Sequence, residues 1–90
     1  MNTVKKGCLA EYKVKKRLEK EGYSYFIRSH GSRTPIDLLA SDGNAIIAVQ
    51  VKSGYISSEE KTNLIEWATK FNAIPHVARK ERGRWVVSRI

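Results

Sequence analysis

An acid, an amide and a lysine lie close together on a predicted hairpin of otherwise apolar strands. The segment from Pro35 to Lys52 reads P-I-D-L-L-A, then a turn, then A-I-I-A-V-Q-V-K. Side chains alternate along a strand, so Ala48, Gln50 and Lys52 share one face of the second strand. Burying polar groups without partners costs roughly a few kcal/mol each. We therefore expect Gln50 and Lys52 to be paired or to be used in function.

The acid of this hairpin, Asp37, makes a metal site the natural interpretation. The predicted register places Asp37 opposite Ala48, with Gln50 as its diagonal neighbour at roughly 7–8 Å. One Mg²⁺ ion can bridge that gap, because Mg²⁺ prefers oxygen ligands such as the Asp37 carboxylate, the Gln50 amide oxygen and the Val51 main-chain carbonyl. Lys52 can then orient or deprotonate an attacking water and offset phosphate charge. The pattern indicates metal-assisted phosphodiester hydrolysis.

The first predicted helix contributes a second acid. Val4, Gly7, Glu11, Val14 and Leu18 follow one another at helical spacing, so Glu11 lies within the stripe that faces the sheet. An isolated inward Glu usually pairs with a nearby Lys. With Asp37 and Lys52 in the sheet below, we instead predict that Glu11 joins the metal site. Gly7 allows the helix to approach the sheet or a phosphate closely.

The segments that must position these side chains have patterns that predict an α/β fold of order αβββαββ. The hairpin turn is predicted at Asp42-Gly43, and a capping box at Ser57 and Glu60 opens the second helix. We expect one domain over residues 1–90. The predicted elements are a helix over Thr3–Glu21, strands over Tyr23–Arg28, Ile36–Ala40 and Ala45–Ser53, a helix over Ser58–Phe71, and a closing hairpin of Pro75–Lys80 and Arg84–Ile90.

The net charge of the chain indicates the kind of partner that it binds. The chain carries a formal net charge of +8 at pH 7 and a pI near 9.9, which favours nucleic acid, because neutralised phosphates release counterions. The alternative is a basic domain with no such partner. No segment approaches the ~20 apolar residues that span a membrane, so no membrane partner is expected. The single cysteine, Cys8, forms no internal disulfide, which fits a cytoplasmic, nucleoid-associated protein.

Four short motifs, taken in order, resemble the PD-(D/E)XK nuclease superfamily. They are G-x-x-x-E (Gly7 to Glu11), R-S-x-G-S (Arg28 to Ser32), P-I-D (Pro35 to Asp37) and Q-V-K (Gln50 to Lys52). The resemblance implies a restriction-endonuclease-like α/β core, with a mixed central sheet flanked by two helices. Within this superfamily the chain is similar to the archaeal Holliday junction resolvases. Their helix, loop and strand motifs match nearly the whole chain in order and spacing.

The resemblance implies a homodimer with two active sites that cleaves paired strands of a four-way DNA junction in recombination and repair. It implies Mg²⁺ as cofactor, with Mn²⁺ as a possible substitute. Glu11 would hold or position a metal-bound water, Asp37 would be the principal ligand and Lys52 the catalytic lysine. The loop serine that touches the phosphate or the water would be Ser32. The residues expected at the DNA are Lys5, Lys6, Gly7, Arg28, Ser29 and Arg33.

The chain departs from the family pattern at two places. Gln50 stands where the family usually has Glu, and we interpret this as weakened or retuned metal ligation. The stretch from Ser53 to Ser57 is shorter than the corresponding family loop. Three alternatives stay open: another endonuclease of the superfamily, for repair, a mobile element or restriction; a catalytically inactive DNA-binding module; and plain electrostatic DNA binding.

Overall fold

The computed structural model describes residues 3–29 and 34–90, with residues 3–9 described by their main chain alone. The elements are α1 (Thr3–Lys20), β1 (Tyr25–Arg28), β2 (Leu38–Ser41), β3 (Ile46–Lys52), α2 (Ser58–Lys70), β4 (Ile74–Glu81) and β5 (Arg84–Arg89). The predicted order αβββαββ is confirmed. Neither helix of this described part is long and apolar enough to cross a membrane.

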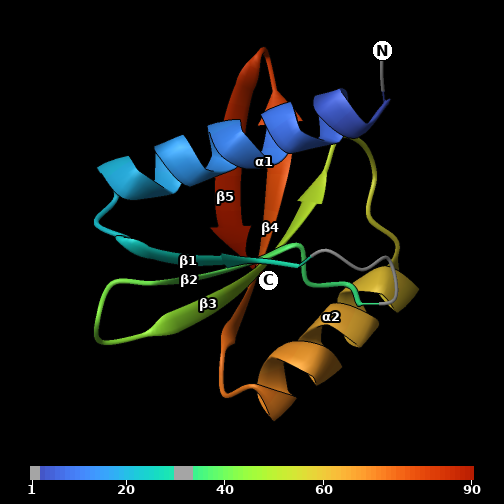
Figure 1. The fold of residues 1–90 in the computed structure, drawn as a ribbon. Coiled ribbons are helices and arrows are strands. Elements are labelled where there is room, and N and C mark those ends of the chain that lie inside the picture. The colour runs from blue at the N-terminus through green and yellow to red at the C-terminus, as the bar shows by residue number, and fades with distance from the viewer. Residues whose placement is uncertain (1–2, 30–33) are drawn as a thin grey trace.

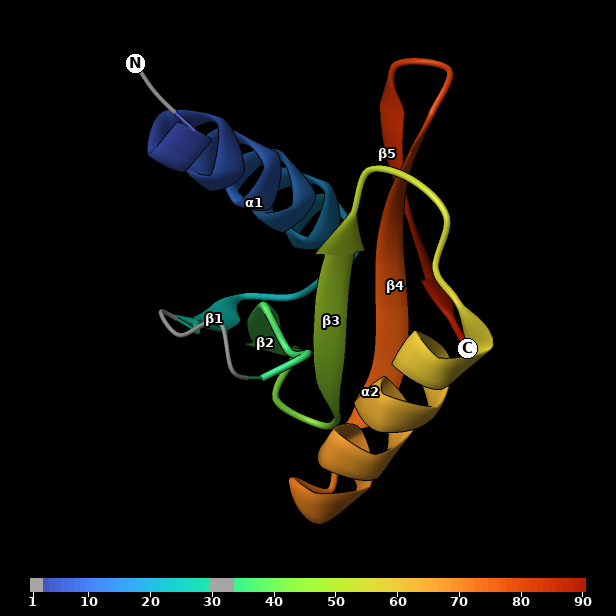
Figure 2. The same cartoon turned by 90° about the vertical axis from the view of Figure 1, so that its right-hand side faces the viewer.

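The strands form one mixed sheet in the order β1-β2-β3-β4-β5. Strands β3 and β4 run parallel, and the other neighbours are antiparallel. A parallel pair needs a crossover connection, and α2 provides it. Helix α1 lies across one face of the sheet and α2 lies against the opposite face (Figures 1 and 2). The predicted sheet with two flanking helices is therefore confirmed.

Each helix buries one half of the core. On the α1 face, Val14 and Leu18 pack against the sheet residues Leu38, Ala40, Ile47, Val49 and Ala78. On the α2 face, Leu64 and Ala68 pack with Ile36, Ala48, Ile56, Ala73 and Val77. Neighbouring residues of β3 thus alternate between the two halves, as the period of a strand requires. The predicted separation of Ala48 from Val49 and Val51 is confirmed.

The β2–β3 register differs from the prediction. Ser41 pairs with Ile46, and Leu39 stands opposite Ala48, so the expected pairing of Asp37 with Ala48 is wrong. The cause is the turn, whose loop runs from 42 to 45. The Asp42 carboxylate accepts hydrogen bonds from the main-chain N–H groups of Asn44 and Ala45 at 2.8 and 2.9 Å, an Asx turn. This local bonding moves the loop one residue along the chain.

The element ends also shift, for local reasons. Strand β1 begins at Tyr25 and not at Tyr23, because the Tyr23 N–H donates to the Leu18 carbonyl and closes the end of α1. Strand β2 begins at Leu38, two residues later than predicted. The β4–β5 turn has two residues instead of three, since Arg82 and Gly83 both take positive φ, 51° and 79°. That geometry suits the twist of a two-residue hairpin.

Candidate active site

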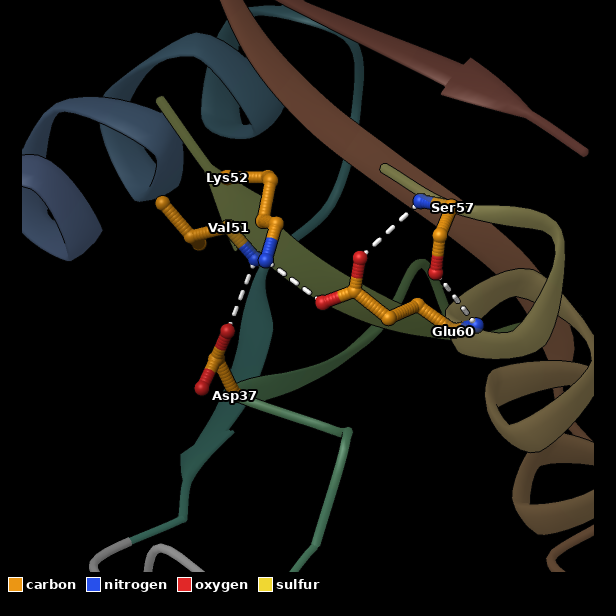
Figure 3. A network of polar contacts seen from close by, with 5 residues as sticks. All are labelled: Asp37, Val51, Lys52, Ser57 and Glu60. Atoms are coloured by element: carbon orange, nitrogen blue, oxygen red, sulfur yellow. Dashed lines mark hydrogen bonds and ion pairs between the residues drawn. The ribbon is translucent and has the colours of Figure 1, made fainter. Parts of the chain in front are cut away.

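Asp37 lies immediately before β2 and continues the pairing of that strand with β3. Its main-chain N–H donates to the Val49 carbonyl at 2.9 Å. Its Oδ2 accepts a hydrogen bond from the Val51 N–H at 2.8 Å (Figure 3). The carboxylate therefore takes the place of a main-chain acceptor where β2 has not yet begun. One carboxylate oxygen is held by the sheet in this way, so Oδ1 is the oxygen that a ligand can use.

The environment of Asp37 contains two further charges. Burial raises the pKa of Asp37, and the nearby Glu11 carboxylate adds to the rise. The hydrogen bond from Val51 and the positive charge of Lys52 act in the opposite direction and favour the ionised form. Glu11 and Asp37 are therefore near each other on the same side of the molecule. They also line one pocket, together with Ala10, Val51, Ser53, Lys80 and Trp85.

Glu11 is bonded to a second predicted site residue. The Nε of Arg28, at the end of β1, donates to Glu11 Oε1 at 2.6 Å. The Glu11 side chain is 18% exposed and that of Arg28 is 43% exposed. The structure thus joins the acid expected at the metal to the arginine expected at the DNA. An exposed guanidinium can exchange a carboxylate for a phosphate, because both offer oxygen acceptors.

Lys52 is held by a residue that the sequence analysis assigned only to a helix cap. Its Nζ donates to Glu60 Oε2 at 2.5 Å, from β3 to the first turn of α2 (Figure 3). The other oxygen of Glu60 accepts the Ser57 N–H at 2.9 Å, and Ser57 Oγ accepts the Glu60 N–H at 3.1 Å. The predicted capping box is confirmed. The hydrogen bond from Lys52 is the main cause that lowers the pKa of Glu60 to about 2.

Gln50 has a buried amide oxygen, Oε1, with no hydrogen-bond partner in the described part of the chain. An unpaired buried acceptor costs about 1–3 kcal/mol, so such an atom calls for a ligand. The pairing of β2 with β3 ends at Leu38 and Val49. Beyond it the Asp37 N–H donates to the Val49 carbonyl, so Gln50 is not the cross-strand partner of Asp37.

The side-chain oxygens of Glu11, Asp37 and Gln50 suit a hard divalent cation, and their total negative charge is low. Mg²⁺ takes carboxylate and amide oxygens and keeps several waters, which matches one Asp, one Gln and a neighbouring Glu. No group of three or more His, Cys, Asp and Glu side chains able to hold a metal occurs among the described residues. Glu11 and Asp37 are the two acids that line the pocket, and Gln50 of β3 is an amide and not a third acid.

The structure describes the other predicted site residues less completely. The Ser29 N–H donates to the Asp37 carbonyl at 3.1 Å, which fixes the loop end beside the site. Val51 contributes its N–H, and the role of its carbonyl as a metal ligand stays a prediction. Ser32 and Arg33 lie outside the described residues. Lys5, Lys6 and Gly7 lie on α1 in the part described by main chain alone.

Three residues at the site escaped the sequence analysis: Glu60, Lys80 and Trp85. Lys80 and Trp85 pair across the β4–β5 hairpin and form one wall of the pocket that contains Glu11 and Asp37. Their positions in the predicted closing hairpin gave no signal of this. For Glu60 a signal was present, since the second helix begins shortly after Lys52 and its first turn must return to the end of β3.

Comparison with known proteins shows which family this chain matches. The family model for the archaeal Holliday junction resolvase (Hjc) matches residues 2–90. Among solved structures, the Holliday junction resolvase Hjc of Archaeoglobus fulgidus is similar with a TM-score of 0.75 and 31% sequence identity. The similarity covers 93% of this chain and 72% of that one. The search of curated proteins gave no match.

Proposed function

Because this chain belongs to the archaeal Holliday junction resolvase family, we propose that it is a metal-dependent endonuclease that cuts four-way DNA junctions by phosphodiester hydrolysis. The observation that carries the proposal is the meeting of Glu11 and Asp37 at one pocket. Gln50 of β3 adds a buried amide oxygen that has no hydrogen-bond partner among the described residues. Residues 1–90 act as a single nuclease domain in this proposal. Its place of action is the cytoplasm, at the nucleoid.

Asp37, Gln50 and Glu11 would hold the cation, Mg²⁺ or Mn²⁺ in its place. When bound, the cation would polarise the scissile phosphate and make a bound water more acidic. The residues of the chain prepare this site. The Val51 N–H fixes one oxygen of Asp37. The buried amide oxygen of Gln50 has no donor among the described residues, and the Lys52 ammonium would offset negative charge on the phosphate.

DNA binding in this proposal depends on the net charge of +8. Arg28 is exposed beside Glu11 and can contact a backbone phosphate near the cleaved bond. The positions predicted from the family resemblance, Lys5, Lys6 and Arg33, would extend this contact. Affinity for DNA should then fall steeply as salt concentration rises, because each neutralised phosphate releases counterions.

We further propose that the chain acts as a homodimer, which would place two active sites on the two strands to be cut. The surface that supports this is an apolar face of α2, where Trp67 and Phe71 stack with ring centroids 6.4 Å apart. Phe71 is 52% exposed, and Ile27 of β1, beside the same rings, is 68% exposed. Exposed apolar patches of this kind mark interfaces. Phe71→Ser should convert a dimer to a monomer in light scattering after gel filtration.

Gln50 favours a second candidate, a catalytically inactive junction-binding module. A neutral amide gives the site one negative charge less than an acid would, and divalent cations bind more weakly as ligand charge falls. Such a module would bind junctions in the same orientation without cutting them. The presence or absence of cleavage separates the two candidates.

The deciding experiment compares cleavage of a mobile four-way junction with cleavage of linear duplex of the same sequence. Each substrate is tested with Mg²⁺, with Mn²⁺ and with EDTA, and Asp37→Asn serves as the matched control. We expect cleavage of the junction with metal only, and Asp37→Asn should bind the junction without cutting it. Equal cutting of both substrates would assign a different endonuclease, and binding without cutting under every metal condition would assign the inactive module.

A further inference from the structure

Glu60 uses both of its carboxylate oxygens at the connection between β3 and α2 (Figure 3). One oxygen accepts the Lys52 ammonium and the other accepts the Ser57 N–H. The Glu60 main chain is held in turn by Ser57 Oγ. An ordinary exposed ion pair must immobilise two flexible side chains, which cancels much of its attraction. Here the capping box has already fixed the acid, so only the lysine must be ordered.

Lys52 lies at the end of β3, two residues after Gln50 and on the same face of the strand. Its charge reaches Asp37, so the ammonium is close to the proposed metal ligand. A lysine is a point charge on a flexible stem of four carbons, and its position depends on a partner. Gln50 has no charge to offer. Glu11, the other acid of the site, is bonded to Arg28.

We propose that Glu60 is a positioning residue, which holds the Lys52 ammonium at the active site and supplies from α2 the negative charge that Gln50 lacks. This inference rests on the proposed nuclease function. An ammonium group has three donors, so the bond to Glu60 leaves two of them for the phosphate and the attacking water. The fixed Glu60 carboxylate thus orients the Lys52 ammonium and leaves its other N–H donors available.

The test separates the charge of Glu60 from its role in the cap. Glu60→Gln removes the charge, and a glutamine at this position of a capping box can still accept the Ser57 N–H. We expect the single-turnover rate of junction cleavage to fall about 10-fold, at the low end of the effect of removing an outer partner of a metal site. Junction affinity should stay close to that of the wild type, and the melting temperature should fall only slightly, because the lost ion pair is partly exposed.

Ser57→Ala is the matched control for folding. It removes the hydroxyl that accepts the Glu60 N–H and leaves the carboxylate free to bind Lys52. We expect a lower melting temperature with cleavage close to that of the wild type, measured well below that temperature. If instead Ser57→Ala slows cleavage as much as Glu60→Gln does, Glu60 acts through the helix cap and the proposal is wrong.

The decisive experiment asks whether an acid at position 50 restores the cleavage that is lost when Glu60 is replaced. Gln50→Glu is introduced into the wild type and into Glu60→Gln, and cleavage is measured for all four proteins. If Glu60 replaces the missing charge, the new carboxylate should accelerate the Glu60→Gln protein several-fold more than it accelerates the wild type. An equal factor in both backgrounds, or wild-type cleavage by Glu60→Gln, would overturn the inference while leaving the nuclease intact. Absence of cleavage by the wild type would overturn the proposed function itself and this inference with it.

Discussion

Two acid–cation pairs flank Asp37, one supplied by each helix, and they are held in different ways. On the α1 side, Glu11 binds Arg28 of β1 at 2.6 Å, and Arg28 is 43% exposed. On the α2 side, Glu60 binds Lys52 of β3 at 2.5 Å and also accepts a main-chain N–H. Glu60 cannot leave its lysine without disturbing the cap of α2. Glu11 has only to release an exposed arginine before it can turn toward a ligand.

The difference separates a fixed part of the site from an adaptable part. Both pairs act on the pKa of Asp37. Burial raises that pKa most, Glu11 adds to the rise, and Lys52 lowers it. A cation that binds Asp37 would further offset the repulsion between the carboxylates of Asp37 and Glu11. We therefore expect Glu11 to respond to metal and Glu60 to remain where it is.

The largest effect that separates the two pairs should come from Glu11→Gln. We expect junction cleavage to fall about 10–100-fold, as for other partners of a metal site, and the Mg²⁺ concentration for half-maximal cleavage to rise. Glu60→Gln should leave that concentration unchanged, since Glu60 touches the lysine and not the metal. The measurement is cleavage rate against Mg²⁺ concentration for both variants. An equal shift in both would remove the distinction between a fixed and an adaptable pair.

The anchoring of Glu60 can be measured through the stability of the fold. Ser57→Ala removes an N-cap hydroxyl, which costs about 1 kcal/mol of unfolding free energy, or roughly 4–8 °C in Tm for a domain of this size. Glu11→Gln should change Tm much less, because an exposed pair contributes about 0–1 kcal/mol. Thermal unfolding followed by circular dichroism gives both values. A larger loss for Glu11→Gln would contradict the ranking.

Asp37 itself should reveal the cost of burying a carboxylate, to which the nearby Glu11 adds. Its pKa is raised in the folded protein, so the folded state binds this proton more tightly than the unfolded state does. Stability is then lost as pH rises through the folded pKa and is fully present below the unfolded value near 3.8. Asp37→Asn should therefore raise Tm by a few degrees at pH 7 in EDTA, and this gain should vanish at pH 3. Mg²⁺ should raise Tm of the wild type only.

The smallest effect should be the change in unfolding free energy when Glu60 is protonated at acid pH. Its pKa is lowered from 4.5 to about 2, mainly by Lys52, so its contribution to stability is present above pH 4.5. The contribution is lost as pH falls toward 2. The difference in unfolding free energy between wild type and Glu60→Gln should thus shrink over this interval. A difference that is constant from pH 6 to pH 2 would show that the ion pair does not form in solution.

Sequence patterns predicted those parts of the fold that local rules determine. Alternation placed Ala48 and Val49 on opposite faces, and the spacing of Ser57 and Glu60 predicted the capping box; both are confirmed. The β2–β3 register was missed, because the Asp42 carboxylate binds two N–H groups of the loop and shifts the turn. A turn dipeptide locates a hairpin without fixing which residues pair across it.

The ion pairs of the site could not be predicted in the same way. Glu60 already had a complete role in the helix cap, and its short separation from Lys52 along the chain was the one signal of a second partner. Arg28 and Glu11 are 17 positions apart, and their contact depends on how α1 crosses the sheet. Contacts of this kind follow from tertiary placement. The polar residues of β3 were located by their pattern, and their partners became visible only in three dimensions.

The short connection between β3 and α2 makes chain length a determinant of lysine geometry. Lys52 and Glu60 are only eight positions apart, and Ile56, buried in the α2-side core, anchors the connection between them. Extra residues placed before Ile56 could bulge into solvent and leave the helix where it is. Extra residues placed after Ile56 would rotate the first turn of α2 and carry the carboxylate away from the ammonium. Homologous enzymes with longer connections would then need a different anchor for the same lysine.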